Sequence, residues 1–293
     1  MGDFAEQLSH ARERGGAFLV PEGIRLRLSG ADAFRYLNGQ ITRDLKRLPD
    51  GEALRACLLT AKGKLSAVVA ITRDGGDLIV EAEASLGEAL RERLERYLVA
   101  DDVEILSEPW RPRLHLFAGE GQELPAGVDS GVSLARLGVP GRDVPVDDAV
   151  SAGLADSLVV EILRIERGVP AWGRELDSET LPPEAGLDRT HIDYDRGCYP
   201  GQEVISRLKS IGRVNRLLHG FRGEALASGA VILSDEGREI GAITSAASLS
   251  GCRESVALGY LQRGTAGAAK GLLVRHPLTG EKTPISITDT FAA

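Results

Sequence analysis

One stretch of the chain combines a thiol with the residues of a tight turn. It covers residues 193–203 and reads Asp-Tyr-Asp-Arg-Gly-Cys-Tyr-Pro-Gly-Gln-Glu. Pro200 has the fixed φ that the second position of a type II turn needs, and Gly201 supplies the positive φ of the third position. Residues 202–208 have one apolar side and are read as a short helix or extended segment. We therefore expect Cys198 just before the start of this segment.

The charges around Cys198 bear on what its thiol could do. Arg196 precedes it, and Arg207 and Lys209 follow. Positive charge and the backbone N–H groups of a helix start favour the thiolate, which is the reactive form of cysteine. A free cysteine is more often buried, here beneath the Pro-Gly turn. On these residues alone, both a reactive and a packed cysteine remain open.

This stretch also begins a basic segment in an acidic protein. The 293 residues hold 35 Lys and Arg against 43 Asp and Glu, a net charge of 35 − 43 = −8. Such a balance disfavours membrane binding or direct nucleic-acid binding as the main activity. Residues 196–219, by contrast, have Glu203 as their one acid among Arg196, Arg207, Lys209, Arg213 and Arg216. This segment suits a small anionic ligand, a local RNA contact or simply a solvated basic face.

Residues 197–203 closely resemble the signature of the YgfZ family, K-G-C-[FY]-x-G-Q-E, and Arg196 keeps the charge of its first position. That family consists of folate-binding proteins related to the glycine cleavage T-protein, an aminomethyltransferase. Residues 163–176 resemble the superfamily stretch R-x-E-x-G-x-P-x-x-G-x-E-L. Residues 37–44, 58–64 and 182–187 match further family segments. The resemblance covers most of residues 24–220.

The resemblance implies that tetrahydrofolate or another folate derivative is bound in a central cleft, with Cys198 exposed at its rim. A carboxylate can accept two hydrogen bonds from the pterin's 2-amino group and ring N–H, and Glu166 is the candidate for this role. Arg164 and Arg207 are the other folate candidates. On the residues alone, Arg164 and Glu166 could equally form a surface ion pair. The remaining signature-loop residues would shape the loop around Cys198: Arg196, Gly197, Tyr199, Gly201, Gln202 and Glu203.

The function that the resemblance implies is that of a folate-binding accessory protein for iron–sulfur cluster assembly or repair, with an indirect effect on tRNA modification. Its partners would be iron–sulfur proteins or their assembly factors, and Cys198 would be the catalytic residue. The alternative is a folate-dependent aminomethyl or methyl transferase that acts on an unidentified amine. The aminomethyltransferases have an acid just after a Gly-Gly turn, whereas residues 63–69 have none near Ala67. We therefore do not expect a glycine cleavage enzyme.

Three smaller interpretations concern single side chains. His191 precedes Cys198 by seven residues, so a Cys–His thiol hydrolase is conceivable, although no oxyanion element is identifiable. Trp110 and Trp172 could stack on a pterin or simply pack in the core. Cys57, Cys198 and Cys252 lie far apart, without the spacing of a zinc or iron–sulfur site. We expect no bound metal and a reducing compartment.

The pattern of apolar residues predicts the elements that must position these side chains. Alternation predicts strands at residues 24–28, 53–60, 65–72, 78–82, 103–106 and 114–117. A short helix is expected after residues 29–32, with Phe34, Tyr36 and Leu37 buried. A second helix follows a capping box at residues 85–88. Strands before and after two helices predict a ferredoxin-like α+β lobe.

The second half of the chain predicts a different architecture. Residues 156–167 are expected to form a helix with Leu158, Ile162 and Ile165 on one face. Short strands then follow at residues 217–221, 230–233, 239–244, 255–261, 272–275 and 285–288, which indicates a small β-barrel. The predicted fold class is α+β, T-protein-like, with ferredoxin-like lobes before the barrel. The expected domains are residues 1–118, 119–210 and 211–293.

The start of the chain bears on the expected location. Residues 1–6 lack a basic region followed by an apolar core, and no window is long and apolar enough for a membrane span. We therefore expect a cytoplasmic protein if the source is bacterial.

Overall fold

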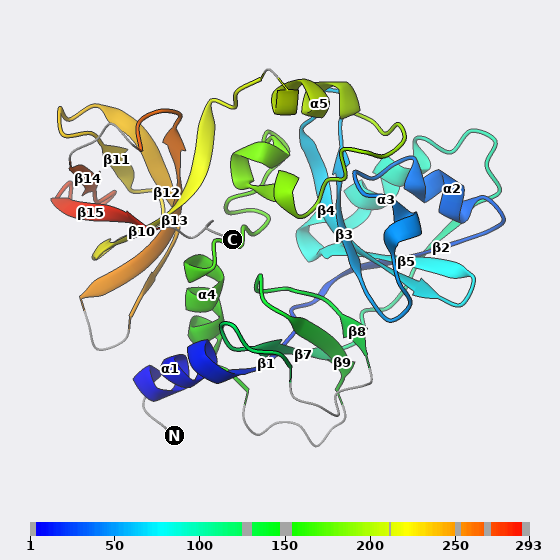
Figure 1. Ribbon diagram of the computed structural model, residues 1–293, viewed down its shortest axis with the longest axis horizontal. Helices are drawn as coiled ribbons and strands as arrows, with labels where there is room; N and C mark the ends of the chain where they lie inside the picture. Colours follow the sequence, from blue (N-terminus) through cyan, green and yellow to red (C-terminus); the bar gives the residue numbers. More distant parts are fainter. Residues whose placement is uncertain are drawn as a thin grey trace.

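The computed structural model describes residues 4–124, 131–146, 154–210, 212–249, 253–266 and 271–288. Over these ranges the chain forms a five-stranded sheet, a four-stranded sheet and a closed barrel. Figure 1 shows the barrel at one end of the molecule, the five-stranded sheet at the other, and the four-stranded sheet between them at the bottom of the view. The predicted fold class, α+β with a C-terminal β-barrel, is confirmed.

The five-stranded sheet has the order β3-β4-β5-β2-β6, and neighbouring strands are antiparallel. Without β3, the order β4-β5-β2-β6 and the two intervening helices are those of a ferredoxin-like unit. β3 is an additional strand at the edge. The elements in chain order are β2 (Gly23–Ser29), α2 (Ala33–Asn38), β3 (Leu54–Leu59), β4 (Leu65–Asp74), β5 (Asp77–Glu83), α3 (Gly87–Glu95) and β6 (Glu104–Ser107).

Side chains alternate between the two faces of this sheet, as the period of two requires. On β4, Ala67, Val69 and Ile71 face a core that α2 and α3 complete, whereas Val68 and Ala70 face the rest of the protein. Two details of the helices differ from expectation. Phe34 is half-buried, although Tyr36 and Leu37 are buried as predicted. The N-cap of α3 is Leu86, not Ser85, because a single 3-10 turn (Ala84–Leu86) leads directly into the helix.

The four-stranded sheet joins segments from far apart in the chain. Its order is β1-β7-β9-β8, formed by β1 (Gly15–Leu19), β7 (Arg113–Ala118), β9 (Gly141–Pro145) and β8 (Val132–Ser133). β1 follows α1 (Phe4–Arg14), and neither element is among those predicted from the apolar pattern. The sheet therefore crosses the boundary expected at residue 118, and the three-domain division stays a prediction.

Helix α4 (Ser157–Glu166) connects this sheet to the barrel (Figure 1). The side chain of Asp156 caps it by accepting a hydrogen bond from the backbone N–H of Leu158 at 2.8 Å. Ile162 and Ile165 are buried as expected, but Leu158 is 39% exposed, because the buried face is completed by Val159 and Leu163 instead.

The barrel closes in the order β10-β13-β12-β11-β14-β15. All six strands predicted from the pattern are present: β10 (Arg216–Glu224), β11 (Val231–Leu233), β12 (Glu239–Ser248), β13 (Glu254–Gln262), β14 (Leu272–Arg275) and β15 (Lys282–Thr288). Phe221, Ile232, Ala257 and Leu261 are among the side chains that fill its interior. The barrel thus has a core of its own.

Candidate functional site

The structure distinguishes between the two interpretations of Cys198. Its side chain is exposed, so it is not packed beneath the turn. Gly201 has φ +84°, as predicted from the turn, and α5 (Gln202–Ser210) begins immediately after it. The side-chain amide of Gln202 donates to the carbonyl of Arg196 at 3.3 Å and so closes the loop around Cys198. The thiol therefore stands in solvent on a short, internally bonded loop.

Arg196 fixes this loop to a segment more than 150 positions earlier. Its Nη1 donates to the carbonyl oxygens of Ile41 at 2.9 Å and Arg43 at 2.5 Å, and its Nη2 donates to that of Asn38 at 2.5 Å. The guanidinium also lies over the ring of Tyr199, 5.3 Å from its centre. Burial lowers the pKa of Arg196. This cation thus works mainly as an anchor for the loop.

Asp193 makes a second connection between the same two segments. Its Oδ2 accepts from the backbone N–H of Asp44 at 2.9 Å, and its Oδ1 lies 3.3 Å from Arg43 Nε and from Arg47 Nη1. The backbone N–H of Asp193 donates to the carbonyl of Thr42 at 3.0 Å. Asp193, just before the signature loop, therefore joins this loop to residues 42–47, which overlap the family segment at 37–44.

The turn at residues 60–64 completes this joint. A Cβ on Gly201 would lie 2.5 Å from the carbonyl oxygen of Thr60, and a Cβ on Gly63 would lie 2.9 Å from Val204. Both glycines also have positive φ. Only residues without a side chain allow these two backbones to come so close. Three of the stretches that carry the family resemblance are thus parts of a single structure beneath Cys198.

His191 does not pair with the thiol. It is 2% exposed, its Nδ1 lies 2.7 Å from the hydroxyl of Thr190, and its Nε2 has no hydrogen-bond partner within the described ranges. Burial lowers the pKa of His191 well below its ordinary value. Cys57 is also buried, which raises the pKa of its thiol to about 12. Cys252 lies outside the described residues, and the structure gives the thiol-hydrolase interpretation no Cys–His contact.

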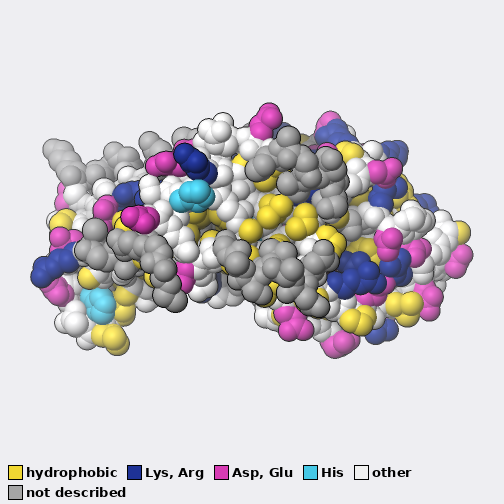
Figure 2. Space-filling model, turned by 90° about the horizontal axis from the view of Figure 1, so that it is seen from below, with side chains coloured by type: hydrophobic (Ala, Val, Ile, Leu, Met, Phe, Trp, Pro, Cys, Tyr) yellow, Lys and Arg dark blue, Asp and Glu magenta, His cyan; other side chains and the backbone are white. Residues whose placement is uncertain are grey.

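A cavity of about 550 Å³ lies between the two sheets and α4. Figure 2 shows hydrophobic side chains gathered near the middle of the face that is seen from below. The residues that line the cavity are mostly apolar and come from both sheets, from α4 and from the loop that follows it. They include Phe18, Val20, Val68, Ala70, Leu137, Val160, Val169 and Leu187, with the rings of Trp110 and Trp172. Both tryptophans therefore lie where they could contact a bound ring.

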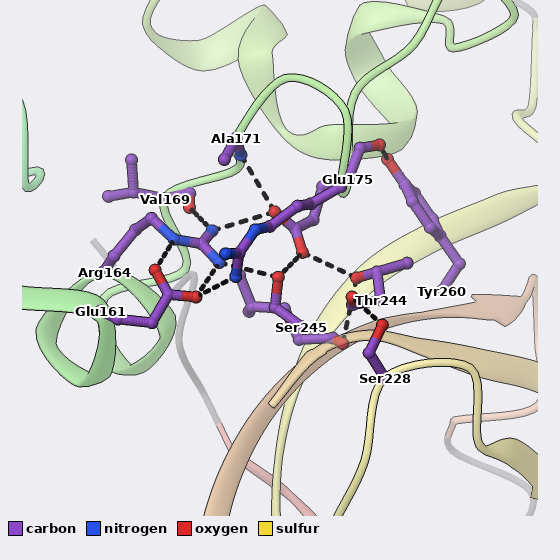
Figure 3. Close-up of polar contacts among 11 residues, drawn as sticks. Glu161, Arg164, Val169, Ala171, Glu175, Ser228, Thr244, Ser245 and Tyr260 are labelled. Carbon is purple, nitrogen blue, oxygen red and sulfur yellow. Dashed lines mark hydrogen bonds and ion pairs between the residues drawn. The ribbon is translucent and has the colours of Figure 1, made fainter. Parts of the chain in front are cut away.

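The polar side of the cavity wall is a buried network that joins α4 to the barrel (Figure 3). Arg164 donates from Nε and Nη2 to Glu161 at 2.8 Å and from Nη1 to Glu175 at 2.9 Å. Its Nη2 also donates to the hydroxyl of Ser245 at 2.7 Å, and Glu175 accepts from Ser245 and Thr244. Burial opposes the charge, but the two carboxylates raise the pKa of Arg164. Arg164 and Glu161 line the cavity, so the network also shapes its wall.

Two of the three folate candidates lie outside this cavity. Both carboxylate oxygens of Glu166 accept from Arg12, Oε1 from Nη2 at 2.5 Å and Oε2 from Nε at 3.0 Å. Its Oε1 also lies 3.4 Å from Nη2 of Arg222. Arg207 is 69% exposed and pairs with Glu203 on α5. The carboxylate of α4 that does line the cavity is Glu161. The expectation for Glu166 is thus corrected: Glu166 lies at the end of α4, on the side that faces α1 and β10, whereas Glu161 is more than one turn earlier.

Cys198 is not among the residues that line the cavity, and its expected place at the rim stays a prediction. The acid that the aminomethyltransferases have after a Gly-Gly turn is missing here near Ala67, on β4. Ala67 and Val69 point into the core beneath α2 and α3, and the β4 side chains that face the cavity are those of Val68 and Ala70. Neither of these two can donate or accept a proton through its side chain. In the part of the chain that the structure describes, no group of three His, Cys, Asp or Glu residues could hold a metal ion.

Sequence reasoning did not identify Glu161 or Arg55, both of which line the cavity. Glu161 could have been found from its spacing, because Glu161 and Arg164 lie three apart on one helix face. Arg55 interrupts the apolar side of a strand that was otherwise read correctly. No helix within the described ranges is long and apolar enough to cross a membrane.

No protein-family model matches the chain. The chain is similar to an aminomethyltransferase of Rubrobacter xylanophilus, with 28% identity over 94% of this chain and 83% of that protein. It is also similar to the tRNA-modifying protein YgfZ of Escherichia coli, with 26% identity over 68% of this chain and 69% of that protein.

Among solved structures, the glycine cleavage system aminomethyltransferase T of Bartonella henselae has the same fold. Its TM-score is 0.75 at 20% identity, over 97% of this chain and 88% of that one. The two sequence relatives and the shared fold agree with the motifs that meet beneath Cys198. In sequence and in fold, the chain is therefore similar to the YgfZ proteins and the aminomethyltransferases.

Proposed function

We propose that this protein is a folate-binding accessory protein whose central cavity holds tetrahydrofolate or a related folate. The observation that carries the proposal is the cavity itself. About 550 Å³ of mostly apolar space, with two tryptophan rings and a few ionised groups in its lining, is typical of a small-molecule site. A pterin ring could pack against Trp110 or Trp172. Its donor pair could face the carboxylate of Glu161.

The exposed thiol is the second part of the proposal. Cys198 would handle a sulfur, iron or one-carbon intermediate in the assembly or repair of iron–sulfur clusters, and through such clusters the protein would affect tRNA modification. Two observations support this role: the side chain of Cys198 is exposed, and Arg196 anchors the loop that presents it. The name of the Escherichia coli relative supports the link to tRNA. Assembly factors for iron–sulfur proteins would be the partners.

The alternative is a folate-dependent methyl or aminomethyl transfer to an amine. Such a reaction needs a group that takes up a proton near the folate. Near the position where the aminomethyltransferases have their acid, the β4 side chains that face the cavity, Val68 and Ala70, offer none. We therefore prefer the accessory role. An assay of folate-dependent one-carbon transfer from N-methyl substrates distinguishes the two, because clear turnover would favour the transferase.

The cavity is tested by titration with tetrahydrofolate in a calorimeter. We expect micromolar binding to the natural protein, which corresponds to about 8 kcal/mol. The variant Ala70→Phe would place a ring inside the cavity without removing any polar contact, and it should weaken binding by at least about tenfold. Equal affinity for a folded Ala70→Phe protein would place the ligand elsewhere.

The thiol is tested by complementation of a strain that lacks its own member of the family. Cys198→Ala should fail to restore iron–sulfur enzyme activity, because it removes the thiol. The variant should still fold, since an exposed side chain can be replaced without loss of fold. Ser206→Ala, also exposed and on α5, serves as the matched control and should complement fully. Full rescue by Cys198→Ala would remove the proposed role of the thiol.

A further inference from the structure

One positive charge in the cavity wall has no counter-ion among the described residues. Arg55 lies on β3 and lines the cavity. Its one hydrogen bond within the described ranges runs from Nη1 to the carbonyl oxygen of Ala135 at 3.0 Å. No described carboxylate lies within ion-pair distance of its guanidinium.

The sheet register explains why the nearest acid on this face does not reach Arg55. Arg55 stands opposite Ala70 on β4, and Ala70 stands opposite Glu81 on β5. Two strand spacings, about 10 Å, therefore separate Arg55 from Glu81. Glu81 is also occupied, because it accepts from Arg25 at 2.5 Å and from Arg113 at 2.8 Å. The small side chain of Ala70 leaves the space between them open to the cavity.

The other ionisable groups around Arg55 do not neutralise it. The nearby guanidinium of Arg136 has the same charge and is bound to Asp143, with Nη2 to Oδ2 at 2.5 Å. Asp143 also contacts Nδ1 of His115 at 2.8 Å. Burial lowers the pKa of both His115 and His191. Asp143 opposes this shift at His115, and the charge of Arg55 adds to the lowering at both. These two histidines are therefore neutral, as is Cys57, the next cavity-side neighbour on β3.

Arg55 is half-buried, and the other charged side chains in this part of the cavity wall are paired. Glu161 is held by Arg164 and by Arg174, and Arg164 is held by Glu175. Proteins rarely keep a buried charge without a partner, since its desolvation is not compensated. Burial indeed lowers the pKa of Arg55 to about 10. A guanidinium in this state, facing an open cavity, is a natural partner for an anion.

We propose that Arg55 binds a carboxylate group of the ligand that occupies the cavity. This inference rests on the proposed folate function, since the glutamate portion of a folate supplies such carboxylates while its pterin ring is uncharged. Arg55 then acts as a specificity-determining residue. It distinguishes complete folates from pterins that lack the glutamate tail, and its planar guanidinium can hold a carboxylate through two parallel hydrogen bonds.

Calorimetry with two probes tests this role. The probes are tetrahydrofolate and 6-methyltetrahydropterin, which has the ring but no carboxylate. Arg55→Leu should weaken tetrahydrofolate at least about tenfold and leave the pterin unchanged, and Arg55→Lys should restore part of the loss. Arg73→Leu is the matched control, since Arg73 lies on the same sheet outside the cavity and also bonds to backbone carbonyls. Equal weakening of both probes, or of neither, would overturn the assignment.

A second measurement keeps this inference separate from the proposed function. If neither probe binds to the natural protein, the folate proposal fails, and Arg55 is then tested with sodium sulfate. Sulfate should raise the melting temperature of the natural protein more than that of Arg55→Leu. The unliganded Arg55→Leu protein should itself melt at a higher temperature, because the substitution removes an uncompensated charge. An identical sulfate response and an unchanged melting temperature would overturn the anion site.

Discussion

The loop of Cys198 and the central cavity are built in opposite ways. The loop is exposed, but each connection beneath it is fixed: Arg196 and Asp193 bond to residues 38–47, and Gly201 touches the turn at residues 60–64. The cavity opens to solvent, its lining comes from many separate segments, and Arg55 within it lacks a counter-ion in the described ranges. The first region presents one group rigidly. The second leaves room and charge for a ligand.

Because of this difference, the loop can be identified from a sequence motif, whereas the cavity cannot. A rigid joint needs particular residues at fixed spacing, such as a glycine against a carbonyl or an arginine against three carbonyls. A cavity needs only apolar residues of suitable size at positions set by the fold. If the two regions are truly separate, substitutions in one should leave the other intact, and the expected effects can be ordered by size.

The largest effect is expected at the wall that the cavity shares with the barrel. Glu175→Ala would leave the buried guanidinium of Arg164 with one carboxylate fewer, and it would remove the acceptor of Ser245 and Thr244. Breaking a buried pair from one side costs about 3–5 kcal/mol. Urea unfolding should show this loss.

The matched control for Glu175→Ala is Arg174→Ala. Arg174 is 53% exposed and pairs with Glu161, so the loss should stay below about 1 kcal/mol. Similar losses for both variants would mean that the Glu175 network does not hold the barrel.

The second effect concerns the crowded turn beneath Cys198. Gly201→Ala combines a positive φ of 84° with a Cβ that would lie 2.5 Å from the carbonyl oxygen of Thr60. We expect a loss of about 3 kcal/mol in the free energy of unfolding. Gly173→Ala has a similar φ of 77° with nothing within 4 Å, and it should cost only about 1 kcal/mol. Equal losses would show that the contact with residues 60–64 is unimportant.

A third, smaller effect isolates the joint between the loop and residues 42–47. Asp193→Ala removes the acceptor for Asp44 N–H and the partner of Arg43 and Arg47. Hydrogen bonds to a charged group contribute about 1.5–3 kcal/mol, so we expect a loss near 2 kcal/mol. Cys198 should then react faster with a thiol reagent, while binding in the cavity stays unchanged. A parallel loss of cavity binding would join the two regions into one site.

The smallest effect is a dependence on pH. Burial lowers the pKa of His191 well below its ordinary value of 6.5, so the unfolded chain binds a proton that the folded chain excludes. The stability that His191 contributes is complete above pH 6.5 and is lost as the pH falls below it. Between pH 6.5 and 5 this amounts to about 1–2 kcal/mol. His191→Gln should flatten the curve of unfolding free energy against pH in this range, and an unchanged slope would contradict the assignment.

Much of the fold could be predicted from the sequence, because apolar alternation on the strands follows directly from one buried face. The six barrel strands and the meander are examples. β1 could not be predicted in this way, since its partner β7 lies almost a hundred residues further along the chain. The N-cap of α3 was misplaced because a 3-10 turn replaces the expected capping box.

The same distinction between local and long-range information applies to the candidate site residues. Cys198, Arg196 and Gly201 were found from a local motif, and their local geometry agrees with the turn chemistry. Glu166 was chosen from a motif as well, but a motif does not show which way a helix face points, and Arg12 binds this carboxylate outside the cavity. Arg55 was not identified because its importance comes from the lack of a carboxylate partner among the described residues. No local sequence motif reports which groups surround a side chain in the fold.

Folate binding in the cavity is tested most directly by one calorimetric titration with tetrahydrofolate on three proteins: the natural chain, Ala70→Phe in the cavity and Cys198→Ala on the loop. We expect micromolar binding that Ala70→Phe weakens by at least about tenfold and Cys198→Ala leaves unchanged. Binding that survives in Ala70→Phe and is lost in Cys198→Ala would contradict this expectation, because the ligand would then belong to the loop and not to the cavity.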